Sequence, residues 1–583
     1  MKSKTTILGW VAAGIALAIG CFLYFQLVVP YHVRFKEQIQ LFVFSSSSVL
    51  SYFSKPAVFA RLGGDFLTQF FYLIGGGAAI ITLLLLTEWR LIFSTLKRFS
   101  QRNAFLLGVV SLLPVIIEWI LYPDLSFSVA LSVSFIIALS AFILYTKTKG
   151  KMSIVLGIIL IPILYIIAGA SVFLFVVLAV LYEVQGERQK AKGKPFFALR
   201  LLPFALCLFM PFIFRHIYLL TLKQAFFYPY FNIKQASSLA ALALIVLLFV
   251  CIKNLRIPDF GSRTKPLRPY LSVFLFVLLI VLLIAGLVKT TKRNRNMENI
   301  YGISIEAYCN NWNKVLEIAE KAKLKNSVAT CYTNIALSKK SLLGEQLMNF
   351  YQPFTSGLLI PMAPDAGWFA IFSGSDAYYH IGDMRMAQFA AMLGMTFSPN
   401  QRSARMMERL VETNMANGDT AVAMKYMRIL ESTLFHKIKP DRLKDIPHRG
   451  IFREDIIRRA NDIKTSLELL AESDPANLPA LNYLLSYYLL SKDIPSFFKA
   501  YTSYYKEKYP YAPKVYAEAL LIYFAAEKSP VDEVLSYGIH PELIKSFSEY
   551  TRLYEKSNGN LASLQKEFPN TYWLYYHFAV KNN

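Results

Sequence analysis

Charged residues are scarce in this chain. They make up 17% of its 583 residues, whereas soluble globular domains average about 25%. Hydrophobic residues make up 55%, so the chain is not wholly soluble. Acidic residues are rarest where apolar ones are densest: residues 1–288 hold 26 Lys and Arg but 8 Asp and Glu, whereas residues 289–583 hold 36 and 30. The imbalance predicts a membrane domain over 1–288 and a soluble domain over 289–583.

Several chemical signatures are also missing from the sequence. It has no P-loop, no HExxH, no GxSxG and no GxGxxG in a useful context, which disfavours ATP-driven chemistry in the cytosol. The five cysteines form no CxxC and no Cys/His ligand spacing. A bridge between Cys309 and Cys331 stays open if their half lies outside the cytosol. The excess positive charge sits in loops between apolar runs, so we expect no nucleic-acid partner.

Long apolar runs fill the first half. A spanning helix needs about 20 apolar residues, and such runs lie at about 7–29, 66–94, 104–122, 126–146, 199–216, 236–253 and 270–288. The stretch 152–184 is too long for one crossing. It contains Pro162 and Ala168-Gly169-Ala170, so we expect it to turn back and to cross twice. The sequence therefore predicts about nine spans.

Basic connections between the runs orient them. Cytoplasmic loops are enriched in Lys and Arg, and the basic connections are 1–4, 97–102, 147–151, 188–194 and 256–268. All of them fall on one side if 152–184 crosses twice. This predicts a cytoplasmic N-terminus and a periplasmic C-terminal half in a bacterial inner membrane. The basic residues at 289–295 oppose this topology. The first run exceeds a signal-peptide core and lacks a small-x-small cleavage site, so we expect a retained anchor.

The predicted first external loop, residues 30–65, combines apolar and basic residues. Its segment 31–44 has the pattern of a helix that lies in the membrane interface, and the serines of 45–48 are expected to break it. Arg34, Lys36 and Arg61 lie on a side that the charge rule disfavours for cations. They indicate either an anionic ligand or a rim of side chains in contact with phospholipid.

Acidic residues near the outer face are the candidate catalytic groups. Asp65 stands where the second span begins, Glu118 lies near the outer end of the third, and Asp124 follows in a short turn. A carboxylate near hydrocarbon is costly, so it marks a functional site by default. Asp65 and Asp124 would hold a divalent cation, Mg²⁺ or Mn²⁺, on a pyrophosphate, or one acid would take a proton from an attacking hydroxyl. The alternatives are a helix cap for Asp65 and a turn residue for Asp124.

Other charged residues of the first half are interpreted by their place along the runs. Arg215 and His216 end an apolar run before an aromatic stretch, 226–231, which suits either a lipid phosphate or an interfacial anchor. Glu88 and Glu183 are expected near span ends. That placement argues against the mid-membrane charge pair of a transporter.

The second half repeats a helix–turn–helix pattern. Gly382-Asp383 and Gly418-Asp419 are 36 positions apart, and Lys492-Asp493 lies 74 beyond Asp419. This spacing fits the 34-residue tetratricopeptide class with slack, whose stacked helix pairs offer a groove for peptides or proteins. Asn311-Trp312 is expected to open the second helix of the first pair. No acid/base cluster stands out, so packing or surface roles are assigned to His380, His436, His448, His540 and His577.

The chain resembles a family of Bacteroidota inner-membrane proteins that have no assigned activity, a multi-span first half and a tetratricopeptide-like second half. The resemblance rests on residues 30–71, especially Lys36-Glu-Gln-Ile-Gln-Leu-Phe and Gly64-Asp-Phe-Leu-Thr-Gln-Phe-Phe-Tyr72, and on Asn311-Trp-Asn-Lys-Val. Its layout also looks like that of GT-C membrane glycosyltransferases. That resemblance implies that Asp65 is the first-loop carboxylate and that Glu118 or Asp124 is the second-loop acid. The paired-acid motif usual in the second loop is not present.

We therefore expect an all-α protein: a polytopic helical bundle followed by a periplasmic tetratricopeptide-like solenoid. The leading hypothesis is a glycosyltransferase or oligosaccharyltransferase that uses a polyprenyl-phosphate-linked sugar donor at the periplasmic face, with a protein or glycan acceptor on the repeat domain. The alternative is a non-catalytic scaffold whose repeats recruit envelope proteins. In the first hypothesis Asp65, Glu118 and Asp124 are catalytic, and the donor phosphate binds Arg34, Lys36, Arg61, Arg215 and His216.

Overall fold

The computed structural model describes residues 4–99, 104–148, 151–189, 207–254, 286, 295–362, 367–438, 443–444, 446 and 461–580. Within these ranges all regular secondary structure is helical and none is strand, which confirms the all-α prediction. The chain divides into two compact units. The first comprises residues 1–37 and 41–295, and the second comprises residues 38–40 and 296–583. This division lies close to the predicted domain boundary at 288.

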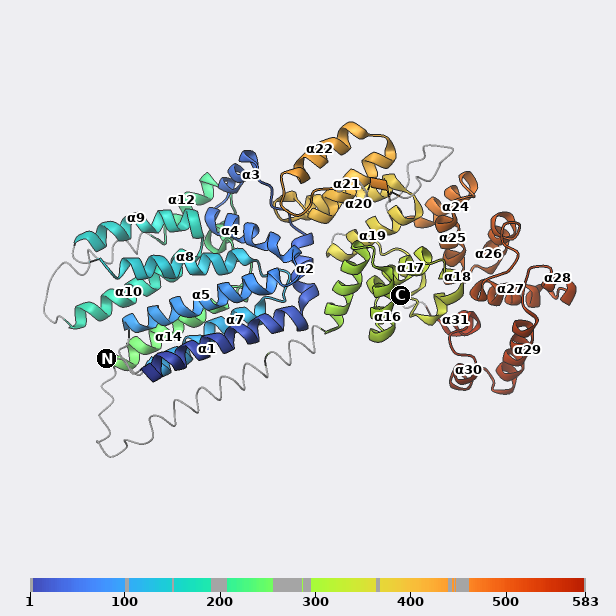
Figure 1. The fold of residues 1–583 in the computed structure, drawn as a ribbon, viewed down its shortest axis with the longest axis horizontal. Coiled ribbons are helices and arrows are strands. Elements are labelled where there is room, and N and C mark those ends of the chain that lie inside the picture. The colour runs from blue at the N-terminus through green and yellow to red at the C-terminus, as the bar shows by residue number, and fades with distance from the viewer. Residues whose placement is uncertain are drawn as a thin grey trace, which may run out of the picture. The chain divides into compact units, whose positions relative to one another are not determined.

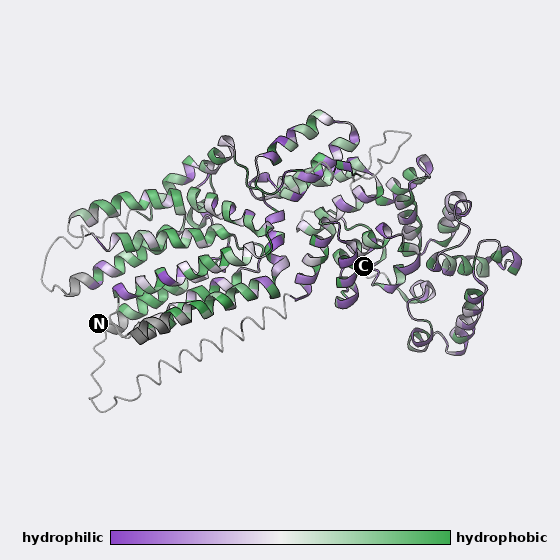
Figure 2. Ribbon diagram, in the orientation of Figure 1, coloured by the Kyte–Doolittle hydropathy of each residue, from purple (hydrophilic) through white to green (hydrophobic). Residues whose placement is uncertain are grey.

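The first unit is a bundle of apolar helices that run side by side (Figure 1). Large apolar side chains such as Ile81, Leu85 and Phe135 are buried between them. Figure 2 shows that hydrophobic residues cover most of the length of these helices. The bundle consists of α1 (Lys4–Leu23), α5 (Gly76–Phe99), α7 (Leu112–Leu121), α8 (Val129–Tyr145), α9 (Lys151–Ala168), α10 (Ser171–Gln189) and α14 (Ser237–Asn254).

Short helices fill the segment between α1 and α5. The helical segments 13–28 and 30–38 meet at a bend of 73°, so the chain changes direction where α2 begins. Ser45, in the run expected to break the helix, caps α3 by accepting a hydrogen bond from the amide of Ser48. The segment contains η1 (Tyr24–Val28), α2 (Pro30–Gln38), α3 (Ser46–Ser51), η2 (Tyr52–Ser54), α4 (Val58–Thr68) and η3 (Gln69–Tyr72); elsewhere in the unit lie α6 (Ala104–Val110), α12 (Met210–Ile217) and α13 (Leu222–Phe227).

The predicted reversal within 152–184 is confirmed. Gly169 has φ +65, a conformation that glycine adopts without steric cost, and it separates α9 from α10. A Cβ at this position would meet the carbonyl oxygen of Tyr228 at 2.4 Å. The amide of Ala170 donates to the same oxygen at 2.8 Å. Pro162 lies inside α9 and does not end it.

The described helices do not support nine membrane spans. Gly76–Phe99 is long and apolar enough to cross a bilayer, and the bent pair 13–28 and 30–38 makes up to two. Five further apolar helical stretches count 10–17 residues within the described part of the chain, short of the roughly 20 residues that a crossing needs. The second run itself starts at Gly76, not at residue 66, since α4 and η3 occupy its first part. The expected span 270–288, except residue 286, and residues 199–206 of the run 199–216 lie outside the described residues.

The second unit consists of helices joined by short turns around a core rich in tyrosine, leucine and alanine. Residues 295–308 are helical. After them follow α16 (Trp312–Ala322), α17 (Ser327–Lys339), α18 (Leu343–Gln346), η4 (Leu347–Asn349), η5 (Phe354–Gly357), α19 (Gly367–Ile381), α20 (Met384–Phe397), η6 (Pro399–Gln401), α21 (Ala404–Asn417), α22 (Thr420–Glu431), α24 (Ile463–Ser473), α25 (Leu478–Leu490), α26 (Ile494–Ala500), η7 (Tyr501–Tyr505), α27 (Lys514–Glu527), α28 (Val531–Leu535), α29 (Pro541–Lys556), α30 (Leu561–Glu567) and α31 (Tyr572–Phe578).

The repeated dipeptides mark the same turn three times, between α19 and α20, between α21 and α22, and between α25 and α26. Their first residues, Gly382, Gly418 and Lys492, have φ of +88, +84 and +62, as is usual where a helix ends in the left-handed conformation. In each case the aspartate amide that follows donates to a carbonyl of the preceding helix. The sequence repeat therefore corresponds to a recurring pair of helices. Cys309 is exposed and Cys331 is buried, and they form no disulfide with each other, so the bridge left open by the sequence is absent.

Candidate functional site

Asp65 lies in a cluster of polar and aromatic side chains on α4. Its Oδ2 accepts a hydrogen bond of 2.7 Å from the hydroxyl of Tyr52, which lies in η2 and is buried. Asp65 itself is half-buried. The structure therefore gives this carboxylate a fixed hydrogen-bond donor while leaving part of it accessible.

Arg61 stands one helical turn before Asp65. Its Nη1 donates to the backbone oxygen of Tyr52 at 3.1 Å, and its guanidinium lies over two rings, 5.2 Å from the centroid of Tyr52 and 5.7 Å from that of Tyr228. Burial raises the pKa of the Tyr228 phenol, with Arg61 opposing and Asp65 adding to the shift. A cation and a carboxylate thus share one environment between α4 and the segment that follows α13.

Glu118 occupies the interior of the bundle. It is 1% exposed, and its two oxygens accept hydrogen bonds from the hydroxyls of Ser132 at 2.6 Å and Ser238 at 2.9 Å. Its position on α7, three residues from the helix end, agrees with the sequence. The helices α8 and α14 cover it. Its full burial was not predicted, because it depends on this packing between distant helices.

Asp124 lies in the turn between α7 and α8, as predicted, and it is engaged there. Its Oδ1 accepts from the amide and hydroxyl of Ser126, at 3.0 Å and 2.8 Å, and its Oδ2 pairs with Lys234 at 2.7 Å. Burial alone would raise the pKa of Asp124, but these hydrogen bonds and the ammonium of Lys234 outweigh it and lower the pKa. Asp124 thus makes the hydrogen bonds of a turn residue, which is the alternative that the sequence left open. Among the residues that the structure describes, no three metal-ligating side chains converge.

The cations assigned to the donor phosphate have different surroundings. Lys36 is buried on α2, and its Nζ donates to the backbone oxygens of Tyr122 and of Phe127, the latter at 2.8 Å. It therefore braces the α7–α8 turn. Arg34 is half-buried on the same helix. In the last turn of α12, Arg215 is half-buried and His216 is exposed.

Glu88 is a residue that the sequence reasoning misplaced. It was expected near the end of a span, but α5 begins at Gly76 and ends at Phe99, which puts Glu88 near the middle of the helix. It is 0% exposed, and it lies within hydrogen-bonding reach of Glu118. In the sequence, Glu88 is visible as an isolated acid between apolar residues. Whether it lies at the middle or at the end of a helix depends on where that helix starts.

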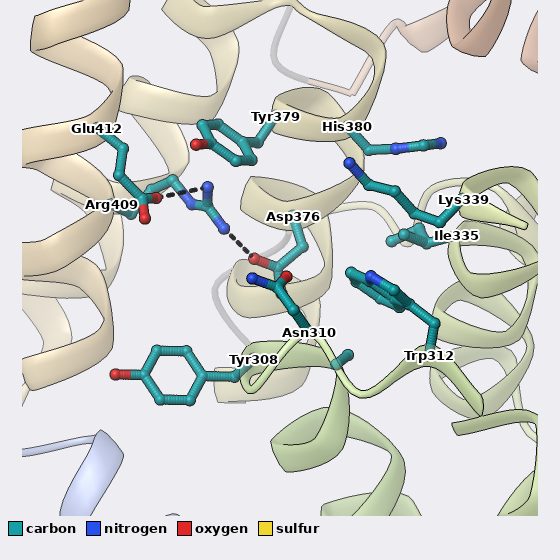
Figure 3. Close-up of a pocket in the computed structure, with 11 residues that line it drawn as sticks. Tyr308, Asn310, Trp312, Ile335, Lys339, Asp376, Tyr379, His380, Arg409 and Glu412 are labelled. Atoms are coloured by element: carbon teal, nitrogen blue, oxygen red, sulfur yellow. Dashed lines mark hydrogen bonds and ion pairs between the residues drawn. The ribbon is translucent and has the colours of Figure 1, made fainter. Parts of the chain in front are cut away.

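The second unit contains a cavity of about 70 Å³, room for a few water molecules or one small polar group. Figure 3 shows Arg409 reaching from α21 between the carboxylates of Glu412 and Asp376, with Trp312 and Lys339 across the cavity. Arg409 pairs with Glu412 at 2.7 Å and with Asp376 at 2.8 Å. The cavity wall therefore presents opposite charges beside aromatic rings.

Asp376 is also held by a second guanidinium. Arg405, whose side chain is 2% exposed, donates to its Oδ2 at 2.5 Å. Arg405 further donates to Tyr332 and to Gln38, which belongs to the second unit. Burial alone would raise the pKa of Asp376, but the two arginines lower it. The only trace of this network in the sequence is the pair of arginines one turn apart on a repeat helix.

Two of the histidines set aside as structural residues lie near these groups. His436 pairs with the buried carboxylate of Glu408 at 2.8 Å. His380 lines the cavity, and burial, together with the nearby Lys339, holds its pKa well below the usual value for histidine. A neutral His380 agrees with a packing role.

The fold defines an all-helical protein of two units, an apolar helix bundle and a unit of paired helices with a charged cavity. A family model described as a family of unknown function, DUF6057, matches residues 4–579. The chain therefore belongs to this family, and the match extends over both units. No curated protein and no solved structure matches the chain.

Proposed function

We propose that the first unit is embedded in a lipid bilayer. Side chains on the outside of its helices support this location: Ile15 is 55% exposed, Leu83 61% and Leu244 56%. They belong to three different helices of the bundle, α1, α5 and α14. In water so much exposed apolar surface on a single chain is costly, whereas in lipid it is the expected outer surface of a helix bundle.

Within that membrane we propose transfer of a sugar or an oligosaccharide from a polyprenyl-phosphate carrier. The observation that carries the proposal is the placement of Asp65 beside Tyr52 and Arg61. Asp65 accepts the proton of the acceptor group that attacks the sugar carbon. The bond from that carbon to the carrier phosphate breaks as the new bond forms, and Arg61 stabilises the charge left on the phosphate. A divalent cation on Asp65 would add to this stabilisation.

Asp65 suits this role better than the other two acids. Glu118 is fully buried and both of its oxygens are occupied by serine hydroxyls. Asp124 is paired with Lys234. The helices α2–α4, which lie between α1 and α5, match the order of elements that the GT-C resemblance implies: a first apolar helix, then a helical loop that carries a carboxylate.

The inner membrane of a bacterium is the proposed location, with the N-terminus in the cytoplasm and the second unit in the periplasm. The second unit would hold the protein or glycan acceptor on its helix pairs. The charged cavity and its aromatic rim support a binding role, since aromatic and arginine side chains are typical of binding sites.

The test is deletion of the gene in its host, followed by profiling of periplasmic glycoproteins and surface polysaccharide. The strain is then complemented with the wild type, with Asp65→Asn or with Arg61→Lys, at matched abundance in the membrane fraction. Asp65→Asn keeps size and removes charge, so we expect it to fail to restore the glycan. Glu317→Gln, an acid on the surface of the second unit, is the control and should restore it.

Restoration of the glycan by Asp65→Asn, or an unchanged glycan profile on deletion, would exclude the transferase. The thermal melting of each purified variant separates loss of activity from loss of fold. An Asp65→Asn protein that melts like the wild type and still fails to complement locates the chemistry at Asp65.

A second candidate function, a membrane scaffold that recruits envelope proteins, is favoured by the cavity of the second unit. It requires no carboxylate chemistry. Under this hypothesis Asp65→Asn complements fully, whereas Trp312→Ala in the cavity wall abolishes both complementation and the capture of partner proteins by the full-length chain.

A further inference from the structure

Two buried carboxyl groups face each other inside the first unit. Glu88 lies on α5 and is 0% exposed, and Glu118 lies on α7 and is 1% exposed. Their side chains are within hydrogen-bonding reach of each other. A carboxylate accepts hydrogen bonds and cannot donate one, so a hydrogen bond between them requires a proton on one of the two.

The hydroxyl groups around the pair indicate which carboxyl holds the proton. Both oxygens of Glu118 accept from serines: Ser132 donates to Oε2 at 2.6 Å and Ser238 donates to Oε1 at 2.9 Å. The hydroxyl of Tyr122, 2.7 Å from Ser132, is then left to donate to that serine. Glu118 is therefore surrounded by donors, as an ionised carboxylate is.

Glu88 has the opposite surroundings. Both of its oxygens are buried and neither has a hydrogen bond of normal geometry; the one hydroxyl within reach, that of Ser132, already donates to Glu118. An ionised carboxylate in this position would carry an uncompensated charge, which costs far more than a neutral acid does. A protonated Glu88 that donates to Glu118 satisfies both groups at once.

Among the described residues, no cation is one of the groups that act most strongly on Glu88 and Glu118. The buried cation Lys36 lies 5.6 Å from the ring centroid of Tyr122 and donates to backbone carbonyl oxygens. The titratable groups that act electrostatically on the pair are Cys21 from α1, Tyr122 from α7 and Tyr230, which follows α13. None of these is positively charged at neutral pH. Two like charges at this separation in an apolar interior do not both ionise.

We propose that Glu88 and Glu118 form a proton-binding site in the bundle, with the proton held on Glu88 and donated to Glu118. The ligand is a single proton, and the hydroxyls of Ser132 and Ser238 fix the accepting carboxylate. The chemistry of this site, the binding of a proton, differs from that proposed for the Asp65 cluster. It does not depend on the proposed transferase function.

The test is infrared spectroscopy of the full-length protein in lipid nanodiscs. At about pH 9, where Glu518 with its pKa of about 7 is ionised, the wild type should show the carbonyl band of a buried carboxylic acid, shifted in D₂O. Glu88→Gln should remove this band, because the glutamine amide takes over the donation to Glu118. Glu118→Gln should retain the band at a shifted frequency, because the acceptor changes. Glu183→Gln is the matched control, a buried acid that accepts from Tyr145 at 2.9 Å, and should leave the band unchanged.

A wild type without such a band at about pH 9, where Glu518 is ionised, would overturn the proposal, and this measurement needs no variant. A Glu88→Gln protein that keeps the full band would also overturn it. If Glu88→Gln does not fold, the Glu118→Gln protein serves instead, and an unshifted band in it would overturn the proposal. A wild-type band that disappears when Na⁺ is added would show that a metal cation is the ligand, which contradicts the proposal.

Discussion

The hydroxyl of Tyr52 donates to Oδ2 of Asp65 at 2.7 Å, and this bond joins η2 to α4. The two residues are thirteen positions apart, and their contact depends on the turn between the two helices. It gives the carboxylate one direction in which its charge is stabilised. Asp65 is half-buried, so part of the residue stays accessible, as a base that meets a substrate requires.

Tyr52→Phe should lower the glycan output without abolishing it. A hydrogen bond to a charged group contributes about 1.5–3 kcal/mol, which corresponds to a loss of about tenfold or more in rate. The measurement is product formation in membranes that contain matched amounts of each variant. Tyr511→Phe, a change at a residue of the second unit that is 79% exposed, is the control and should have no effect. Equal output from Tyr52→Phe and the wild type would contradict the role given to this bond.

Adjacent glycines of α4 should respond differently to alanine. A Cβ on Gly64 would meet the backbone nitrogen of Ala130 at 2.4 Å, whereas a Cβ on Gly63 would meet a side-chain carbon of Val133 at 3.5 Å. Gly64→Ala should therefore push α4 from α8 and cost about 1–3 kcal/mol. Gly63→Ala should be neutral or stabilising by up to about 1 kcal/mol, since alanine favours the helix. Thermal melting of both variants in lipid decides, and equal melting temperatures would contradict the close approach.

Asp376→Asn should destabilise the second unit strongly. The substitution leaves two buried guanidinium groups, Arg405 and Arg409, without their shared carboxylate, and breaking a buried ion pair costs about 3–5 kcal/mol. The expected result is a lower denaturation midpoint of the full chain. Glu317→Gln changes a surface acid that pairs with two lysines and should shift the midpoint little.

The lowered pKa of Asp376 adds a pH dependence to this network. A carboxyl whose pKa is lower in the folded chain contributes stability above its unfolded value, and this contribution disappears as the pH falls through the folded value. Acid unfolding of the wild type should therefore depend on Asp376, and the Asn variant should lose part of this dependence below about pH 4.

Glu518 should give the second unit a pH dependence of the opposite sign. Burial raises the pKa of Glu518 to about 7 from its ordinary 4.5, against the lowering effects of the Tyr572 amide and Lys514. A raised pKa means that the folded chain binds a proton more tightly than the unfolded chain does. Stability is then highest below about pH 4.5 and declines as the pH rises to about 7, by about 3 kcal/mol at most.

The measurement for Glu518 is the unfolding free energy of wild type and Glu518→Gln between pH 4.5 and 7.5. The glutamine oxygen can still accept from the amide of Tyr572, which Glu518 holds at 2.6 Å, but it does not titrate. The variant should show a flatter profile in this range. Parallel profiles for the two proteins would contradict the assignment.

Cys309 allows a test of topology because it is exposed, while Cys21, Cys207 and Cys331 are buried. With Cys251 replaced by serine, a membrane-impermeant maleimide should label the chain at Cys309 from the periplasmic side of cells with a permeabilised outer membrane. Cys309→Ser is the control and should abolish labelling. Labelling that requires disruption of the inner membrane would place the second unit in the cytoplasm.

Sequence patterns predicted the features that depend on local backbone preferences. The reversal at Gly169 and the turns at Gly382 and Gly418 follow from glycine's access to positive φ. The second helix of the first pair, α16, begins at Trp312, as the Asn311-Trp312 segment predicted. These features are encoded within a few residues, so a single sequence suffices to find them.

Features that depend on long-range packing were not predicted. The burial of Glu118 comes from serines 14 and 120 positions away, and the place of Glu88 depends on where α5 starts. The predicted count of nine spans failed because composition reveals apolar runs but not the length of the helices within them. The charged network around Asp376 likewise joins three helices, and no spacing in the sequence indicates that they meet.

The contacts of Lys36 have a consequence for biosynthesis. Its Nζ binds carbonyl oxygens that follow it by 86 and 91 positions. During synthesis, the ammonium group therefore leaves the ribosome long before its acceptors exist, and water or lipid phosphate must solvate it in the meantime. A nascent chain that stops before residue 122 keeps Lys36 in that solvated state. The burial of Lys36 thus reports that the chain through α1, α5, α7 and the turn that follows α7 has been synthesised and that this turn has reached α2.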